Sequence, residues 1–178
     1  TPVKNQDNCG SCWAFATYGS MESFLLPGET WDFSENNLIN THGFDRTNCS
    51  GGNYDMSTAY LARWSGPIRE SDDPYRNYPI PSGLQPVKHV QQVLNIPERA
   101  GSTDNDNLKQ AITTYGGVYT TFYWAESSYD SESYTYYYKN HQGSNHAITL
   151  VGWDDDMSVT RAPGPGAFIV KNSWGTYW

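Results

Sequence analysis

QDNCGSCWAF, residues 6–15, is the stretch on which the interpretation of this chain depends. It holds two cysteines, Cys9 and Cys12, separated by glycine and serine. Apolar residues after Cys12 recur loosely at helical spacing as far as Pro27-Gly28, which predicts a helix over residues 12–26. We therefore expect Cys12 at the amino-terminal end of a helix, where the helix dipole favours an anion such as a thiolate.

Three cysteines occur in the chain, at positions 9, 12 and 49. If two of them form a disulfide, one thiol remains, and a leftover thiol invites a catalytic interpretation. Cys9 and Cys12 form a C-x-x-C pair, a pattern that redox proteins and zinc sites also use. Zinc is disfavoured because there is no second C-x-x-C and the histidines at 42, 89, 141 and 146 lack metal-ligand spacing.

The composition limits the other classes of function. The chain has 178 residues and a net charge of −8, which argues for one catalytic domain and against nucleic acid or an anionic membrane as a partner. No run approaches the roughly 18 consecutive apolar residues of a membrane-spanning helix. With 14 Tyr and 7 Trp but only 11 Lys and Arg, the composition is typical of secreted proteins.

Hydrophobic patterning predicts a helical first half and a β-rich second half. Short helices are expected from Ser34 through Ile39 and over residues 55–63, and then an extended loop over 67–97 with a strand at 90–94. A helix over 106–115 and strands at 118–123, 147–153 and 168–171 follow. This order predicts an α+β fold in which a helical layer faces an antiparallel sheet, with a cleft between the two.

Further motifs extend the pattern along the chain: FSENNL at 33–38, CSGG at 49–52, NHA at 145–147 and KNSWG at 171–175. Together with CGSCW they resemble, in order and over nearly the whole chain, the papain-like cysteine peptidases of the C1 family. CGSCW matches the signature C-G-[SA]-C-[WY] around that family's catalytic cysteine, and a histidine and an asparagine are expected roughly 130 to 150 residues downstream. His146 lies in that window, and Asn172 lies slightly beyond it, as an insertion in the acidic loop 154–166 would explain.

The resemblance implies a role for each of four residues. Cys12 is the expected nucleophile, His146 the general base, and Asn172 the residue that orients the imidazole. Gln6 completes an oxyanion hole with the backbone N–H of Cys12. The helix start and a nearby imidazolium are expected to lower the pKa of Cys12, so that the resting state is a thiolate and imidazolium pair.

The same resemblance assigns the remaining site residues. A disulfide is expected between Cys9 and Cys49, and Trp174 is expected to shield the hydrogen bond between His146 and Asn172 from water. The expected substrate-binding residues are Gly51, Gly52, Asn53, Tyr54, Ala147 and Trp174, with Thr121 as a further lining residue. A small residue such as Ala147 implies a preference for a medium or large apolar side chain at P2, the second residue before the scissile bond.

The resemblance also implies a context for the domain. We expect a single two-lobed papain-like domain over residues 1–178, with a left lobe of about residues 1–100 and a right lobe of about 101–178, apparently truncated at both ends. We expect an endopeptidase without a cofactor, acting on peptides or proteins, with an inhibitory propeptide in its precursor. The acidic insertion favours the subgroup found in bacterial and archaeal surface proteins, and so a secreted or cell-surface location.

Alternative interpretations remain open at this point. The chain can instead be a catalytically silent papain-like binding module of a surface protein. The acidic residues 154–156 can hold calcium, although three acids in a loop usually form a solvated turn. The tyrosine-rich segment 134–138 can be an aromatic wall on the leaving-group side of the cleft or ordinary β-surface.

Overall fold

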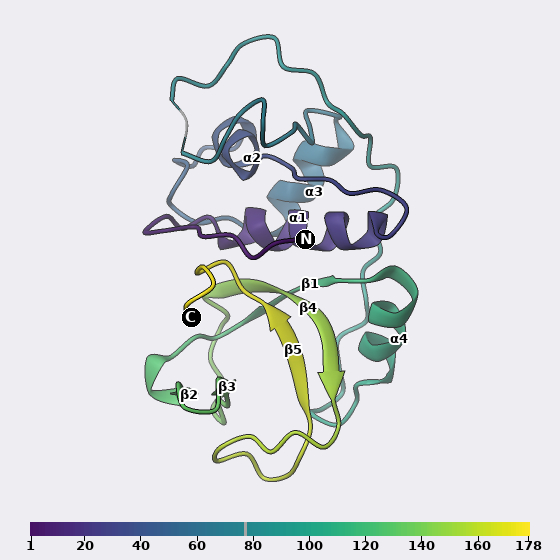
Figure 1. Cartoon of the computed structure of the whole chain (residues 1–178), viewed down its shortest axis with the longest axis vertical. Coiled ribbons are helices and arrows are strands. Elements are labelled where there is room, and N and C mark those ends of the chain that lie inside the picture. The colour runs from purple at the N-terminus through teal and green to yellow at the C-terminus, as the bar shows by residue number, and fades with distance from the viewer. Residues whose placement is uncertain (77) are drawn as a thin grey trace.

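The structure, a computed structural model, describes residues 1–76 and 78–178. Its helices lie mainly in the first half of the chain and its strands in the second, as the sequence predicts. The helices of the first half form one layer, which faces the sheet (Figure 1). The helices are α1 (Cys12–Leu25), α2 (Glu35–Thr41), α3 (Tyr54–Ala62) and α4 (Asp106–Tyr115), with a 3-10 turn at Glu126–Ser128. The strands are β1 (Val118–Phe122), β2 (Tyr129–Asp130), β3 (Thr135–Tyr136), β4 (His146–Asp154) and β5 (Ala167–Lys171).

Helix α1 lies between the sheet and the helices α2 and α3, whereas α4 packs beside β1 and β4 (Figure 1). Residues on all its sides are buried, among them Trp13, Ala14 and Tyr18, as expected of a helix that is covered all round. Gly19 lies where α1 approaches β4, and a Cβ at this position would lie only 2.5 Å from the hydroxyl oxygen of Thr149. The absence of a side chain at Gly19 therefore allows the helix and the sheet to approach closely.

The main sheet is antiparallel and has the strand order β1-β4-β5. Phe122 pairs with His146 and Thr121 pairs with Ala147, while Thr149 pairs with Lys171 at the end of β5. His146 therefore begins β4, and the residue after Lys171 continues from β5 toward the same end of the sheet. This register brings His146 and Asn172, which are far apart in sequence, together at one end of the sheet.

Two predictions for irregular segments were wrong or incomplete. No strand forms at residues 90–94, which are extended but unpaired, and Val93 and Leu94 are about half exposed. Within this segment, Val90 packs against the core without pairing in a sheet. The tyrosine-rich segment 134–138 includes β3, which pairs with β2 in a short hairpin that was not predicted. Within the described residues, no helix is long and apolar enough to cross a membrane.

Candidate active site

Cys12 is the first residue of α1 and the free cysteine among the described residues. The preceding Ser11 occupies the N-cap position, but its side chain makes no capping hydrogen bond. Its hydroxyl lies instead 2.6 Å from the hydroxyl of Tyr75. The first N–H groups of α1 are therefore left without a side-chain partner, and they can stabilise an anion at the start of the helix.

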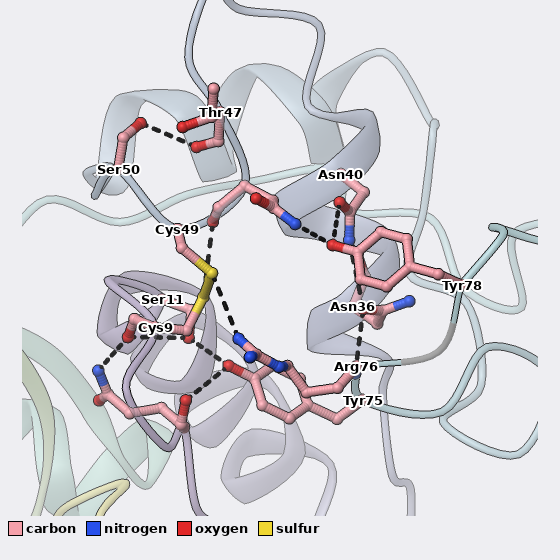
Figure 2. Close-up of a disulfide and its surroundings, with 12 residues drawn as sticks. Cys9, Ser11, Asn36, Asn40, Thr47, Cys49, Ser50, Tyr75, Arg76 and Tyr78 are labelled. Carbon is pink, nitrogen blue, oxygen red and sulfur yellow. Dashed lines mark hydrogen bonds between the residues drawn. A yellow bond between two sulfur atoms is a disulfide. The ribbon is translucent and has the colours of Figure 1, made fainter.

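The loop that precedes Cys12 is held from both sides. The expected disulfide joins Cys9 to Cys49 (Figure 2). The backbone N–H of Gly10 donates a 3.1 Å hydrogen bond to the carbonyl of Cys49. A Cβ at Gly10 would lie 2.6 Å from that carbonyl oxygen, so glycine permits the approach. The hydroxyl of Tyr75 donates a 2.9 Å hydrogen bond to the backbone carbonyl of Gln6. These contacts fix the position of Cys12 relative to its neighbours.

The side chain of Gln6 is buried and oriented by two hydrogen bonds. Its Nε2 donates to the carbonyl of Cys9 at 2.7 Å, and its Oε1 accepts from the hydroxyl of Ser173 at 2.7 Å. The backbone N–H of Gln6 also donates to the carbonyl of Ser173 at 2.8 Å. The amide is thus held in one orientation, and the second proton of Nε2 remains as a donor for another acceptor.

The imidazole of His146 is held by the side-chain amide of Asn172 and the indole ring of Trp174. Nε2 lies 2.7 Å from Oδ1 of Asn172, and the indole of Trp174 stacks on the ring at a centroid distance of 4.4 Å and an angle of 26°. Oδ1 of Asn172 also accepts a 2.8 Å hydrogen bond from the backbone N–H of Ser173. Because Oδ1 can only accept, Nε2 carries the proton, and Nδ1 is the nitrogen left for proton transfer.

The amino-terminal end of β4 lies against Cys12. The backbone N–H of Ala147, the residue after His146, donates toward the sulfur of Cys12 and lowers the pKa of the thiol, as do the N–H groups of Trp13 and Cys12 itself. Burial has the larger effect and raises the pKa of Cys12. Burial likewise lowers the pKa of His146, while the hydrogen bond to Asn172 raises it.

These directions differ from the expectation of a lowered pKa for Cys12. Burial alone favours the neutral thiol and the neutral imidazole, because both charged forms lose hydration. A thiolate and imidazolium pair in this site must therefore draw its stability from the attraction between the two charges and from the N–H groups at the start of α1.

The residues expected to bind the substrate differ in backbone conformation and in exposure. Gly51 has a φ of +86°, and a Cβ at Gly52 would lie 2.4 Å from the ring of Trp13, so both positions favour glycine. Tyr54 is half exposed, whereas Ala147 is buried in the sheet beside Thr121.

The side chain of Asn53, one of the expected substrate-binding residues, also stabilises the start of α3. Its Oδ1 accepts a hydrogen bond from the backbone N–H of Met56 and caps α3. The side chain therefore has a structural role at the start of that helix.

Several residues that hold the site were missed in the sequence. Ser173 lies within the KNSWG motif, but no local pattern indicates its hydrogen bond to Gln6. Tyr75 lies in a loop, and no local pattern indicates that it contacts Gln6 and Ser11. Asn145 makes two hydrogen bonds with the backbone of Trp124. Its Oδ1 accepts from the N–H of Trp124 at 2.6 Å, and its Nδ2 donates to the carbonyl of Trp124 at 3.0 Å.

Two carboxylates of the acidic loop already bind neighbouring protein groups. Asp155 forms an ion pair with Lys109 at 2.5 Å, and Asp154 accepts from the backbone N–H of Asp156. Across residues 1–76 and 78–178, no group of three or more His, Cys, Asp or Glu side chains is arranged to hold a metal ion.

Comparison with known proteins gives consistent results. Residues 1–178 match the family described as "Papain family cysteine protease". The chain is 31% identical over 188 residues to the cathepsin L-like peptidase of Aedes aegypti, a match that spans all of this chain and 52% of that protein. The chain thus spans about half the length of such relatives.

Two solved structures of the clostridial cysteine protease Cwp84 are also similar. One, obtained after propeptide cleavage, has a TM-score of 0.84 and 28% identity, covering 98% of this chain and 48% of the other. The second contains the protease and lectin-like domains of Cwp84, a surface layer associated protein of Clostridium difficile. It has a TM-score of 0.82 and 27% identity, covering 98% of this chain and 42% of the other.

Proposed function

The chain belongs to the papain family of cysteine proteases, and we propose that it is an endopeptidase that hydrolyses peptide bonds through a thioester on Cys12. The observation that carries the proposal is the hydrogen bond by which Asn172 orients the imidazole of His146, next to Ala147, whose backbone N–H donates toward the sulfur of Cys12. A thiol, a base and a group that orients the base form the arrangement required for nucleophilic catalysis.

In the acylation step, the sulfur of Cys12 attacks the peptide carbonyl carbon while its proton resides on Nδ1 of His146. The carbonyl oxygen becomes negatively charged in the tetrahedral intermediate. Nε2 of Gln6 and the backbone N–H of Cys12 are the proposed donors to this oxygen, each worth about 3 to 4 kcal/mol in well-studied enzymes. The C–N bond then breaks, and the proton on His146 passes to the departing amine.

In the deacylation step, His146 takes a proton from a water molecule that attacks the thioester carbonyl. The C–S bond breaks, the acid product leaves, and the proton on His146 restores the starting pair with Cys12. Asn172 keeps the ring in one orientation through both steps. A neutral amide suffices for this role because the positive imidazolium faces the negative thiolate.

The acyl part of the substrate is proposed to lie along Gly51 and Gly52 as an added strand. Ala147 and Thr121 would line the pocket for the P2 side chain, with Tyr54 at its edge. The small Ala147 supports our proposal of a medium or large apolar side chain at P2. A positional peptide library tests it, and a preference for Arg or Lys at P2 would contradict it.

The wider context is also a proposal. We propose that residues of about 1–100 and 101–178 form the left and right lobes of one peptidase domain, and that an inhibitory propeptide precedes it in the precursor. The Cwp84 structures, one of a propeptide-cleaved protease and one described as surface layer associated, support a propeptide and a secreted or cell-surface location. They also support membership of the bacterial surface-protein subgroup.

The test uses the full-length protein and its Cys12→Ala variant with an internally quenched peptide. We expect turnover by the wild type, its loss in the variant, and iodoacetamide labelling of one thiol, since Cys9 and Cys49 are bridged. Hydrolysis that survives Cys12→Ala would refute the proposal. A labelled but inactive wild type would instead favour the silent binding module.

A further inference from the structure

A cluster of five aromatic side chains extends from the imidazole of His146 along one side of the sheet lobe. We call it the aromatic wall. It consists of Trp124, Tyr129, Tyr136, Trp174 and Trp178. Each of these side chains is partly exposed, so the wall presents ring surface to the solvent.

Trp124 is the centre of the wall because it contacts each of the other four rings. It stacks on Tyr136 at 5.0 Å and 21°, and meets the indole of Trp174 edge-on at 4.8 Å and 77°. Its centroid lies 5.5 Å from that of Tyr129 and 5.6 Å from that of Trp178. Offset stacking and edge contacts of this kind are the favoured geometries of aromatic pairs.

The position of Trp124 is fixed by its backbone as well as by its ring. The side chain of Asn145 accepts from the N–H of Trp124 and donates to its carbonyl, and Asn145 immediately precedes His146. The hydroxyl of Tyr136 also accepts from the N–H of Ala125 at 3.2 Å. The wall is therefore a preorganised surface whose geometry is tied to that of the imidazole.

The wall lies on the side to which the leaving group departs. In the proposed mechanism the acyl part follows Gly51 and Gly52 on the helical lobe. The departing amine must receive its proton from His146. Trp174 stacks on that ring and contacts Trp124, so the chain beyond the scissile bond passes His146 toward the wall.

We infer that Trp124 gives this peptidase a preference for aromatic or large apolar side chains in the leaving-group half of its substrates. This inference rests on the proposed function and deepens it. Flat side chains can stack on the exposed parts of the wall, and the rings lose little conformational entropy on binding because their contacts already hold them.

The experiment measures how an acyl-enzyme partitions between water and an added amine. A peptide methyl ester acylates Cys12 and releases methanol, which leaves the wall free. An amino acid amide then attacks the thioester, the C–S bond breaks, a new C–N bond forms, and the amine proton passes to His146. The ratio of aminolysis to hydrolysis reports binding at the wall and does not depend on how much active enzyme is present.

For the wild type we expect phenylalanine amide to react about fivefold to tenfold more efficiently than glycine amide, with leucine amide between them. Trp124→Ala should reduce this discrimination to about twofold or less, and Trp124→Phe should restore part of it. If Trp124→Ala fails to fold, Trp124→Leu keeps an apolar side chain without a flat ring and serves the same comparison.

The matched control is Tyr134→Ala, which removes a tyrosine of the same segment that is 72% exposed and outside the wall. It should leave both ester hydrolysis and the discrimination unchanged. Two outcomes would overturn the inference, provided that the ester is still hydrolysed. One is equal reaction of the three amides with the wild type, and the other is unchanged discrimination in Trp124→Ala. A wild type that does not hydrolyse the ester would overturn the proposed function, and this inference with it.

Discussion

The hydroxyl of Ser173 donates a 2.7 Å hydrogen bond to the side-chain carbonyl of Gln6, across the interface between the two ends of the chain. Ser173 follows Asn172 directly, and its backbone N–H holds the same Oδ1 that binds His146. One short segment therefore orients the proposed base through Asn172 and the proposed oxyanion donor through Ser173.

Ser173→Ala should lower kcat about threefold to tenfold and change KM little. The substitution leaves Oε1 of Gln6 without its partner, while the hydrogen bond from Nε2 to Cys9 and the backbone contact remain. Steady-state kinetics with one peptide test this expectation, and Ser173→Thr, which retains the hydroxyl, should recover part of the loss. An equal loss in both variants would indicate a packing effect rather than a lost hydrogen bond.

The alkaline limb of the pH profile should move in opposite directions in two variants near His146. The hydrogen bond to Asn172 raises the pKa of His146, so Asn172→Ala should lower that pKa and move the limb to lower pH. Asn145→Asp adds a negative charge at the residue that precedes His146, which should raise the pKa of the imidazole and move the limb to higher pH. The measurement is kcat/KM against pH, and shifts in the same direction would contradict the proposed role of the imidazolium.

Gly19→Ala should destabilise the protein by about 1 to 3 kcal/mol, although alanine is normally the better helix former. The added methyl group would press on Thr149 and separate α1, which carries Cys12, from β4, which carries His146. Urea unfolding and peptide turnover should both report the change. Gly28→Ala is the matched control, because a Cβ there lies 3.6 Å from its nearest neighbour, and Thr149→Ala added to Gly19→Ala should relieve part of the effect.

The sequence predicted the parts of this molecule that depend on local pattern. The helix that begins at Cys12 and the strands around Ala147 and Val170 have clear periodicity and flanking turn residues, so their positions agree with the structure within about two residues. Of the residues in the motifs, His146 and Asn172 are joined by a hydrogen bond and the backbone of Ala147 contacts Cys12, while the catalytic roles of these residues stay predictions.

Contacts between distant segments could not be predicted in this way. The hydrogen bond between Ser173 and Gln6 depends on the β4–β5 register and on the path of the amino-terminal segment, neither of which has a local signal. The same holds for Tyr75, whose hydroxyl reaches Gln6 from a loop. The ring contacts of Trp124 likewise arise only when the tyrosine-rich segment folds beside the end of the chain.

A cluster of largely buried charges joins the amino-terminal segment to α1, α2 and β5. The ammonium of Lys4 lies 2.8 Å from a carboxylate oxygen of Glu35 and 3.7 Å from one of Glu22, and Lys171 lies 4.0 Å from the other oxygen of Glu22. Asp32 is a third carboxylate, 2.6 Å from Lys4. Three acidic groups thus face two lysines, and burial together with the neighbouring negative charge disfavours ionisation of Glu35.

Glu35→Gln should therefore change how stability depends on pH. Burial raises the pKa of Glu35 from 4.5 to about 8, although Lys4 acts in the opposite direction. Between these values the folded protein keeps a proton that the unfolded chain has lost, so this contribution to stability is complete below about pH 4.5 and is lost as the pH rises to about 8. One such group changes the free energy of unfolding by at most about 1.4 kcal/mol per pH unit. Urea unfolding at several pH values between 5 and 8 should show that the free energy of unfolding declines in the wild type and declines less steeply in Glu35→Gln. The control is Glu29→Gln, which alters an exposed carboxyl paired with Lys88 and should keep the wild-type slope. Equal slopes in the wild type and Glu35→Gln would show that Glu35 is ionised throughout this range and pairs fully with Lys4.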